Sequence, residues 1–302
     1  MKRDALSALG LASHVAARLA DRSRARQVRE ALEAGQLDVH YQPKIELRSQ
    51  RVSGVEALVR WRHPTRGLLA PAAFLPTDEH DGPMVELTAH VLDVAIGQAA
   101  EWRRRGVSLS VAVNISAASV ADERLAGTID ALLRRFDVPA RQLVLEITET
   151  AVLRDPERCA ELLHEIAGAG VSISLDDFGT GQSSLSRLLR LPIHELKLDR
   201  EFVRAMSVGH DKDRLVHAIL TFAHDLGHRV VAEGVEDRAM LDRLADLGCD
   251  EAQGYYICRP LPADELPDWV LRPRGAADRL FSRPLGGGAW EKPFRAPAVA
   301  WR

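Results

Sequence analysis

The feature that most constrains the fold is a repeat of short apolar runs and longer helical segments, which begins near Leu37. Each apolar run, often rich in β-branched residues, gives way to a polar or glycine turn. Eight runs predict strands, at 37–43, 52–61, 107–114, 142–148, 171–176, 194–199, 228–234 and 250–256. Helical periodicity is found between most of them, at 84–104, 121–135, 156–168, 182–190, 210–226 and 237–247.

Alternation of this kind over eight strands predicts an α/β protein with a closed, TIM-like (β/α)8 barrel. The first two strands are joined only by the segment "KIELRSQR" (44–51), which is too short for a parallel crossover. We therefore expect an antiparallel first strand. An open, doubly wound sheet is the alternative, but no GxGxxG or GxxxxGK[ST] phosphate loop follows any predicted strand.

The two ends of the chain differ from this middle part. We divide the chain into an N-terminal helical segment (1–25), the barrel (26–270) and a tail (271–302) that is rich in proline, glycine and arginine and is predicted to be disordered. The basic face of the N-terminal helices is typical of a solvated surface, and its alternative use is contact with a signalling partner.

Composition excludes several classes of function. The formal net charge is -3, with 40 basic and 43 acidic residues, so nothing draws the whole chain to polymeric nucleic acid or an anionic membrane. No apolar run approaches the roughly 18 residues of a membrane span. The three cysteines are scattered without a CxxC pair, which fits a reducing compartment and argues against zinc. We expect a cytoplasmic protein.

Polar residues follow seven of the eight predicted strands, where the active sites of (β/α)8 barrels lie. They are Glu56, Asn114, Glu146, Asp176, Asp177, Lys197, Glu233 and Gln253. Any one of them alone would be an ordinary loop residue or helix cap. As a set, five carboxylates on one rim would repel each other unless cations were present, and oxygen ligands without Cys or His favour Mg²⁺ or Mn²⁺.

The segment "SISLDDFGTG" (172–181) places two aspartates side by side at the end of an apolar strand. Adjacent carboxylates can give one ligand to each of two ions, and two ions can activate water and stabilise the leaving oxygen of a phosphoester. A nearby Lys and Glu can then orient or deprotonate that water. The pattern indicates metal-dependent hydrolysis of a phosphoester.

Several motifs in one order carry a family resemblance. They are "YQP" (41–43), "EALVRW" (56–61), "RHP" (62–64), "NIS" (114–116), "LEITET" (145–150), "DDFGTG" (176–181), "LKLD" (196–199), "AEGVE" (232–236) and "QGYY" (253–256). With them the chain resembles the EAL-domain phosphodiesterases, which cleave cyclic di-GMP in bacterial signalling. The resemblance covers about residues 26–266.

The resemblance implies a role for each matching residue. Metal ligands match Glu56, Asn114, Glu146, Asp176, Asp177 and Glu233. Catalytic roles match Lys197, which would hold the catalytic water, Glu233 as general base, and Glu56. Substrate contacts match Gln42, Arg60, Gln253 and Glu236, and Glu149 matches the anchor of the loop after the paired aspartates. The reaction implied is hydrolysis of cyclic di-GMP to linear 5′-pGpG on a two-metal Mg²⁺ or Mn²⁺ site, in a homodimer.

Two other functions remain open at this point. One is a catalytically silent receptor that binds cyclic di-GMP and acts through protein contacts; silent relatives usually lose metal ligands, and this chain has them all. The other is a barrel enzyme that stabilises an enediolate on Mg²⁺ with a Lys base, which the paired aspartates and "EALVRW" disfavour.

Overall fold

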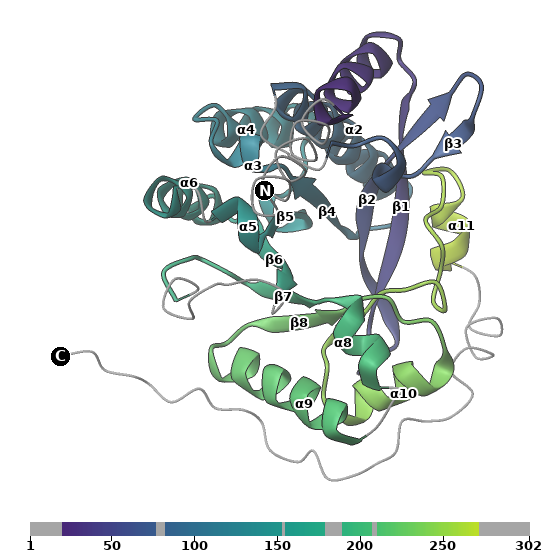
Figure 1. Cartoon of the computed structure of the whole chain (residues 1–302), viewed down its shortest axis with the longest axis vertical. Coiled ribbons are helices and arrows are strands. Elements are labelled where there is room, and N and C mark those ends of the chain that lie inside the picture. The colour runs from purple at the N-terminus through teal and green to yellow at the C-terminus, as the bar shows by residue number, and fades with distance from the viewer. Residues whose placement is uncertain (1–19, 77–81, 153–154, 179–188, 207–209, 272–302) are drawn as a thin grey trace, which may run out of the picture.

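The computed structural model describes residues 20–76, 82–152, 155–178, 189–206 and 210–271 (Figure 1). Its strands are β1 (Leu37–Glu46), β2 (Arg51–His63), β3 (Gly67–Leu69), β4 (Ser110–Ile115), β5 (Leu143–Thr148), β6 (Ser172–Phe178), β7 (Glu195–Leu198), β8 (Arg229–Ala232) and β9 (Glu251–Ala252).

The pairing of the strands closes a barrel. The order β1-β9-β8-β7-β6-β5-β4-β2 returns to its start because β1 also pairs with β2, and β3 extends β2 outside the ring. Strand β1 is antiparallel to both of its neighbours, whereas the pairs from β2–β4 round to β8–β9 are parallel. The predicted eight-stranded α/β barrel with an antiparallel first strand is confirmed.

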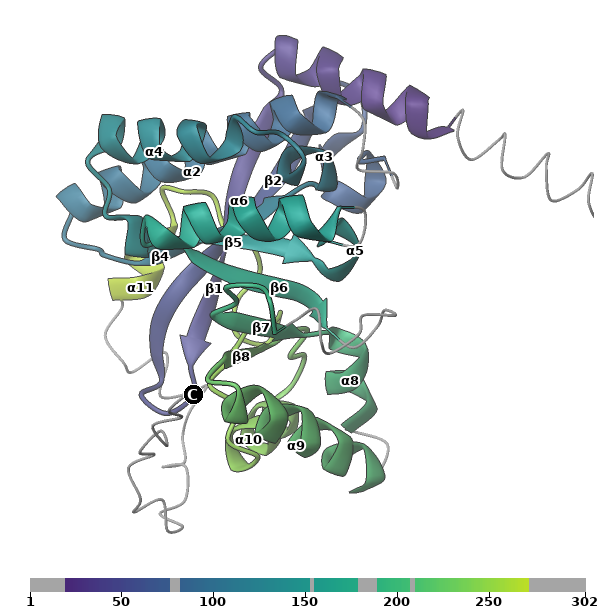
Figure 2. The same ribbon diagram turned by 90° about the vertical axis from the view of Figure 1, so that its left-hand side faces the viewer.

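Helices cover the outside of this barrel. The longer ones are α2 (Gly82–Arg104), α4 (Leu125–Phe136), α6 (Pro156–Gly168), α8 (Arg200–Ala205), α9 (His210–Asp225), α10 (Arg238–Asp246) and α11 (Leu266–Leu271); α3 (Ala117–Val120) and α5 (Glu149–Val152) are single turns. Figures 1 and 2 show α2, α4 and α6 along one side of the molecule and α8, α9 and α10 along the other. Among the described helices none is both long and apolar enough to span a membrane.

Strand alternation separates an apolar outer layer from a polar lumen. On β7, Leu196 and Leu198 belong to the hydrophobic core, while Glu195 and Lys197 alternate with them and face the other way. Both charged residues are nonetheless buried, Glu195 at 8% and Lys197 at 1% exposure. A helix over residues 20–33 adds Val28 and Ala31 to the core.

Some details differ from the sequence-based expectations. The predicted strand 250–256 is wrong in extent: only Glu251–Ala252 pair as β9, because the chain turns back at Gly254 against Val235. Strand β3 and helix α8 were not predicted; both are too short for a periodic signal, and α8 is marked only by its N-cap, Asp199.

Other expectations fall outside the described residues. They are the predicted helix 182–190 over most of its length, the greater part of the N-terminal segment 1–25, and the tail 271–302 beyond Leu271.

Candidate active site

Lys197 lies at the centre of the polar residues that the sequence places at the strand ends. It comes from β7 and is 1% exposed. Its Nζ lies 2.9 Å from Glu146 Oε2, 3.1 Å from Asp176 Oδ2, 2.6 Å from Glu233 Oε1 and 3.9 Å from Glu56 Oε1. The fold therefore collects carboxylates from β2, β5, β6 and the loop after β8 around one ammonium group.

Two amide side chains hold the carboxylate of Glu56. Asn114 Nδ2 donates to Glu56 Oε1 over 2.7 Å, and Gln253 Nε2 donates to Glu56 Oε2 over 2.5 Å. Gln253 Nε2 also donates to Gln42 Oε1. Residue Gln42 is paired with Glu56 in the register of β1 and β2. We call Glu56, Asn114, Glu146, Asp176, Lys197, Glu233 and Gln253 the rim cluster.

The paired aspartates lie where β6 departs from regular geometry. The pairing of β6 with β7 shifts register between Leu175 and Phe178, and Asp177 has a φ of 56°. A positive φ is uncommon for a residue other than glycine and marks local backbone strain. The backbone N–H of Asp177 donates to Asp176 Oδ1 over 2.8 Å. Both aspartates thus lie in the irregular last part of β6, where Asp176 reaches Lys197.

The rim cluster carries more negative than positive charge. Burial raises the pKa of Glu146 well above its ordinary value, although Lys197 and Lys44 oppose that rise. Burial likewise raises the pKa of Glu233 to about 7, against the attraction of Lys197. For Glu56, burial is outweighed by Lys197 and by the hydrogen bonds from Asn114 and Gln253, so its pKa is lowered. One lysine does not neutralise four carboxylates, of which Glu56 and Glu146 are buried and Asp176 and Glu233 are partly buried.

The chemistry of this donor set fits a hard divalent cation. Among the described residues, no three His, Cys, Asp or Glu side chains already converge on a single cation position, and Lys197 Nζ lies between the carboxylates instead. Yet the available ligands are all oxygens, and Glu146 Oε1 is buried without a hydrogen-bond partner. The nearest cation to this oxygen is Lys44 Nζ at 3.9 Å, which is too far for a hydrogen bond. Mg²⁺ or Mn²⁺ would relieve this excess of carboxylate.

The remaining predicted residues lie around this cluster. Arg60 is half-buried on β2, four residues beyond Glu56, and is attracted to it electrostatically. Glu236 is exposed in the loop after β8 and forms an ion pair with Arg204 of α8. Glu149 is buried at the start of α5, but most of the loop that it is expected to anchor lies outside the described residues.

Two glycines of the sequence motifs have a packing reason. A Cβ on Gly254 would lie 2.2 Å from the carbonyl oxygen of Val235, and one on Gly234, at a φ of 68°, would lie 2.5 Å from Cβ of Arg200. Real Cβ atoms do not approach other atoms so closely. The loops that carry Glu233 and Gln253 therefore pack directly on each other, and this places both side chains at the rim.

Sequence reasoning missed a second set of charges, which runs from the buried Lys44 to Arg229, an exposed residue at the start of β8. Lys44 is 1% exposed, and its Nζ lies 3.2 Å from Glu195 Oε1, which also accepts from Ser174 Oγ at 2.9 Å. Nearby, Glu251 accepts from Arg229 at 2.6 Å and from Ser53 Oγ at 2.8 Å. We call Lys44, Ser53, Ser174, Glu195, Arg229 and Glu251 the floor cluster. Its one sequence signal is a charged residue inside each apolar strand, such as the lysine of "YQPKIE".

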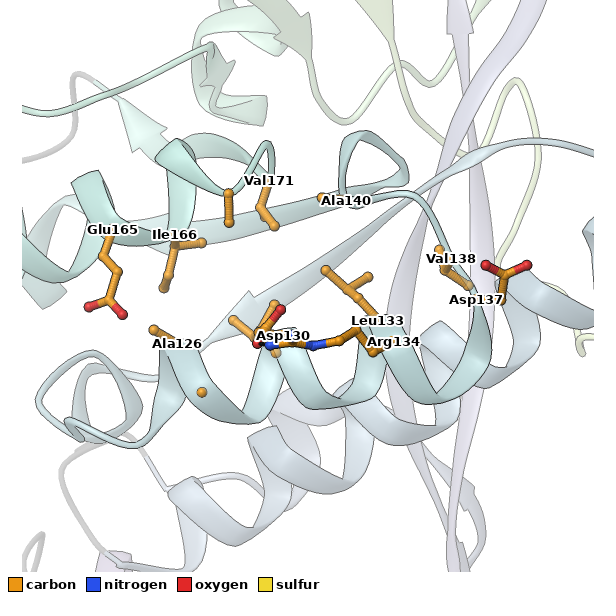
Figure 3. A pocket seen from close by; sticks show the side chains of 13 residues that line it. Ala126, Asp130, Leu133, Arg134, Asp137, Val138, Ala140, Glu165, Ile166 and Val171 are labelled. Atoms are coloured by element: carbon orange, nitrogen blue, oxygen red, sulfur yellow. Dashed lines mark ion pairs between the residues drawn. The ribbon is translucent and has the colours of Figure 1, made fainter.

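A cavity of about 400 Å³ lies elsewhere, between α4 and α6 (Figure 3). Its apolar lining includes Leu133, Val138 and Val171, and the charged residues Asp130 and Glu165 also line it. Val138 and Val171 precede β5 and β6, so the cavity adjoins the ends of these strands opposite to the rim cluster. None of the predicted site residues lines it.

Comparison with known proteins identifies matching sequences and structures. The family model described as "EAL domain" matches residues 25–260. The bifunctional diguanylate cyclase/cyclic di-GMP phosphodiesterase MucR of Pseudomonas aeruginosa is 41% identical over 240 residues, which are 79% of this chain and 35% of MucR. The cyclic di-GMP phosphodiesterase PdeR of Escherichia coli is 39% identical over 245 residues, 81% of this chain and 37% of PdeR. The chain thus spans little more than a third of these relatives.

Solved structures match over the barrel. The PaMucR phosphodiesterase in complex with c-di-GMP superposes with a TM-score of 0.76 at 40% identity, covering 81% of this chain and 99% of that one. The EAL domain of Mycobacterium smegmatis DcpA superposes with a TM-score of 0.66 at 30% identity, covering 78% and 96%.

Proposed function

Since the chain belongs to the EAL domain family, we propose that it is a metal-dependent phosphodiesterase that hydrolyses cyclic di-GMP to linear 5′-pGpG. The observation that carries the proposal is the complete rim cluster, in which Lys197 gathers four carboxylates from separate strands and loops. The names of MucR and PdeR and the c-di-GMP in the PaMucR complex support the choice of substrate.

The cation would be Mg²⁺ or Mn²⁺. Glu56, Asn114, Glu146 and Asp176 would hold one ion, and Asp177, with Glu233 as a further candidate ligand, would hold a second. Bound there, such ions supply Lewis-acid stabilisation of the phosphoryl oxygens and a lowered pKa for the attacking water.

The side chains of the chain itself have separate tasks in this reaction. Lys197 Nζ, among the carboxylates, would orient the attacking water, and Glu233 would accept a proton from it. A pKa of about 7 suits Glu233 to that exchange at neutral pH. Arg60, with Gln42, Gln253 and Glu236 as further candidate contacts, would bind the substrate. The water oxygen bonds to phosphorus, the bond from phosphorus to the 3′ oxygen breaks, and that oxygen leaves with a proton, which gives 5′-pGpG.

A catalytically silent cyclic di-GMP receptor is the second candidate. It would need the same nucleotide-binding barrel but not the carboxylates, so their full retention favours the enzyme. In either case we propose that the protein works in the cytoplasm as a homodimer, with the N-terminal helices available to a signalling partner.

The test is incubation of the purified chain with cyclic di-GMP and Mg²⁺ or Mn²⁺, with an EDTA control, followed by chromatography. Linear pGpG that appears only with metal supports the phosphodiesterase. Tight nucleotide binding without product supports the receptor. If the wild type shows neither product nor nucleotide binding, both candidate functions are overturned.

A further inference from the structure

Helix α8 lies against the segment 233–236, which follows β8. The backbone N–H of Glu233 donates to the carbonyl of Leu198, the last residue of β7, over 3.0 Å. Gly234 packs directly on the Cβ of Arg200, the first residue of α8. The first half of the segment is therefore held by β7 and by the start of the helix.

Glu236, the last residue of the segment, is held in a different way. Its side chain is 47% exposed and forms an ion pair with Arg204 of α8, whose side chain is 50% exposed. Within the part of the chain that the structure describes, this ion pair is the one polar contact of the Glu236 carboxylate. Val235, by contrast, is fully buried, and its backbone is hydrogen-bonded to Gln253 and Tyr256. The direction of the Glu236 carboxylate thus depends on a single side chain from another element.

The spacing of these contacts indicates that the segment runs along one face of α8. Arg200 and Arg204 are four positions apart, so they lie on the same face of the helix with a rise of about 6 Å between them. Gly234 and Glu236 are two positions apart, and two residues span at most about 7 Å. The helix face and the segment therefore match in length, with Gly234 beside Arg200 and Glu236 beside Arg204.

The backbone of α8 is fixed at both ends. Asp199 caps the first turn by accepting from the backbone N–H of Glu201 over 2.7 Å, and Val203 is fully buried in the hydrophobic core. Arg204 follows Val203 directly, so its guanidinium group is attached to a rigid part of the barrel wall. A helix held in this way can restrain a side chain of the neighbouring segment.

A half-exposed carboxylate binds a ligand better when a neighbour restrains it. A free glutamate side chain loses rotamer freedom when it contacts a substrate, and this loss weakens binding. Arg204 reduces the loss in advance, because a guanidinium group donates through a planar and fixed fork. A carboxylate has about four acceptor sites, so Glu236 can accept from Arg204 and still accept from donors such as the N–H groups of a guanine base.

We propose that Arg204 is a positioning residue for the substrate, which holds the carboxylate of Glu236 in the direction that contacts cyclic di-GMP. The inference rests on the proposed function, in which Glu236 is a candidate substrate contact. Glu233 is held separately, through Leu198 and Lys197. Loss of Arg204 is therefore predicted to weaken substrate binding and to leave the turnover step intact.

The test compares Arg204→Met, Arg204→Lys, Glu236→Gln and the double variant Arg204→Met/Glu236→Gln with the wild type. We expect Arg204→Met to raise KM for cyclic di-GMP by about 2–5-fold, the range for a half-exposed ion pair, with kcat changed by less than about 1.5-fold. Arg204→Lys keeps the charge and is expected to recover part of the loss. Because Arg204 acts through Glu236, the double variant is expected to have a KM no higher than that of Glu236→Gln alone.

Arg135→Met is the matched control. Arg135 Nη1 lies 3.0 Å from Asp93 Oδ1, and the two side chains are 66% and 45% exposed. This ion pair joins the last turn of α4 to α2, and α4 leads toward the start of β5, at the end of the barrel away from the rim cluster. Loss of this ion pair is expected to leave KM and kcat unchanged. A rise in KM equal to that of Arg204→Met would overturn the inference.

A second readout depends on neither hydrolysis nor substrate. In crystal structures without nucleotide, the Glu236 carboxylate is expected to contact Arg204 in the wild type and to take another direction, or several, in Arg204→Met. The backbone of residues 233–235 is expected to stay in place in both.

Four results would each overturn the positioning role. They are an unchanged KM in Arg204→Met or Glu236→Gln, a fall in kcat as large as the rise in KM, multiplied losses in the double variant, and an unmoved Glu236 carboxylate in Arg204→Met. If the wild type neither hydrolyses nor binds cyclic di-GMP, the proposed function is overturned instead, and the two crystal structures still decide whether Arg204 positions Glu236.

Discussion

The rim cluster and the floor cluster occupy the same barrel lumen but differ in charge balance. In the floor cluster Lys44 and Arg229 face Glu195 and Glu251, and both oxygens of Glu251 have partners. In the rim cluster Lys197 faces four carboxylates, and Glu146 Oε1 and Gln253 Oε1 are buried without hydrogen bonds. A buried polar set that is satisfied by its own residues is structural, whereas one left in deficit points to a ligand.

The pKa of one glutamate from each cluster shifts in opposite directions, although the pKa of Glu56 in the rim is lowered and burial raises that of Glu251 in the floor. In the floor, burial of Glu195 opposes its ionisation, but Lys44 and the hydrogen bond from Ser174 outweigh burial and lower its pKa. In the rim, burial of Glu146 prevails and raises its pKa, although Lys197 lies 2.9 Å away. Glu146 is the more deeply buried of the two glutamates, and the neighbouring carboxylates of Glu56 and Asp176 raise its pKa further.

The largest expected effect is on the rate of hydrolysis, and it should distinguish two isosteric substitutions, one in each cluster. Glu56→Gln removes a charged rim ligand and is expected to lower hydrolysis of cyclic di-GMP by at least about 100-fold. Glu195→Gln is expected to keep hydrolysis within about 3-fold, because an amide oxygen can still accept from Ser174 and Lys44. Initial rates of pGpG release measure both. Equal losses in the two variants would abolish the distinction between rim and floor.

The next effect concerns stability of the floor. Lys44→Met leaves Glu195 buried without its main counter-charge and is expected to reduce the free energy of unfolding by about 3–5 kcal/mol. Lys44→Met combined with Glu195→Met removes both charges and is expected to recover most of that loss. Urea denaturation measures the three variants. A double variant as unstable as the single one would show that the pair does not act as a balanced unit.

Metal is expected to stabilise the folded protein by binding at the rim cluster, and this effect should not depend on the charges of the floor cluster. At about 100 times its dissociation constant, Mn²⁺ should add about 2.7 kcal/mol to the free energy of unfolding of the wild type. Thermal denaturation with Mn²⁺ and with EDTA measures this effect. The stabilisation should vanish in Glu56→Gln and persist in Glu195→Gln, so that an unchanged melting temperature in the wild type would count against the metal site.

The smallest effect is a dependence on pH in EDTA. Glu233 has a pKa raised from 4.5 to about 7 by burial, so between these values the folded state holds a proton that the unfolded state has lost. The free energy of unfolding must therefore fall as the pH rises through this window. Glu233→Gln cannot titrate and is expected to flatten that part of the profile. A profile of unchanged slope would show that Glu233 is ionised throughout.

Much of the architecture was predictable from sequence because strand and helix periods are local properties. The eight apolar runs, with helical segments between most of them, were sufficient for the prediction of a barrel, and the short link after the first strand was sufficient for its antiparallel direction. The convergence of Glu56, Glu146, Asp176 and Lys197 also followed, since strand ends in such a barrel meet on one rim.

Contacts between residues far apart in the chain were decided only by the tertiary structure. Lys44 and Glu195 are separated by 151 positions, and nothing local shows that they neutralise each other. The bond from Gln42 to the carbonyl of Cys258 spans 216 positions, and only its geometry shows which end of the amide faces Gln253. The sequence by itself determined which residues carry charge and which strands they lie on or follow. Tertiary packing decided which charges are balanced and which way the amides point, because both depend on neighbours that the chain brings together only when the barrel closes.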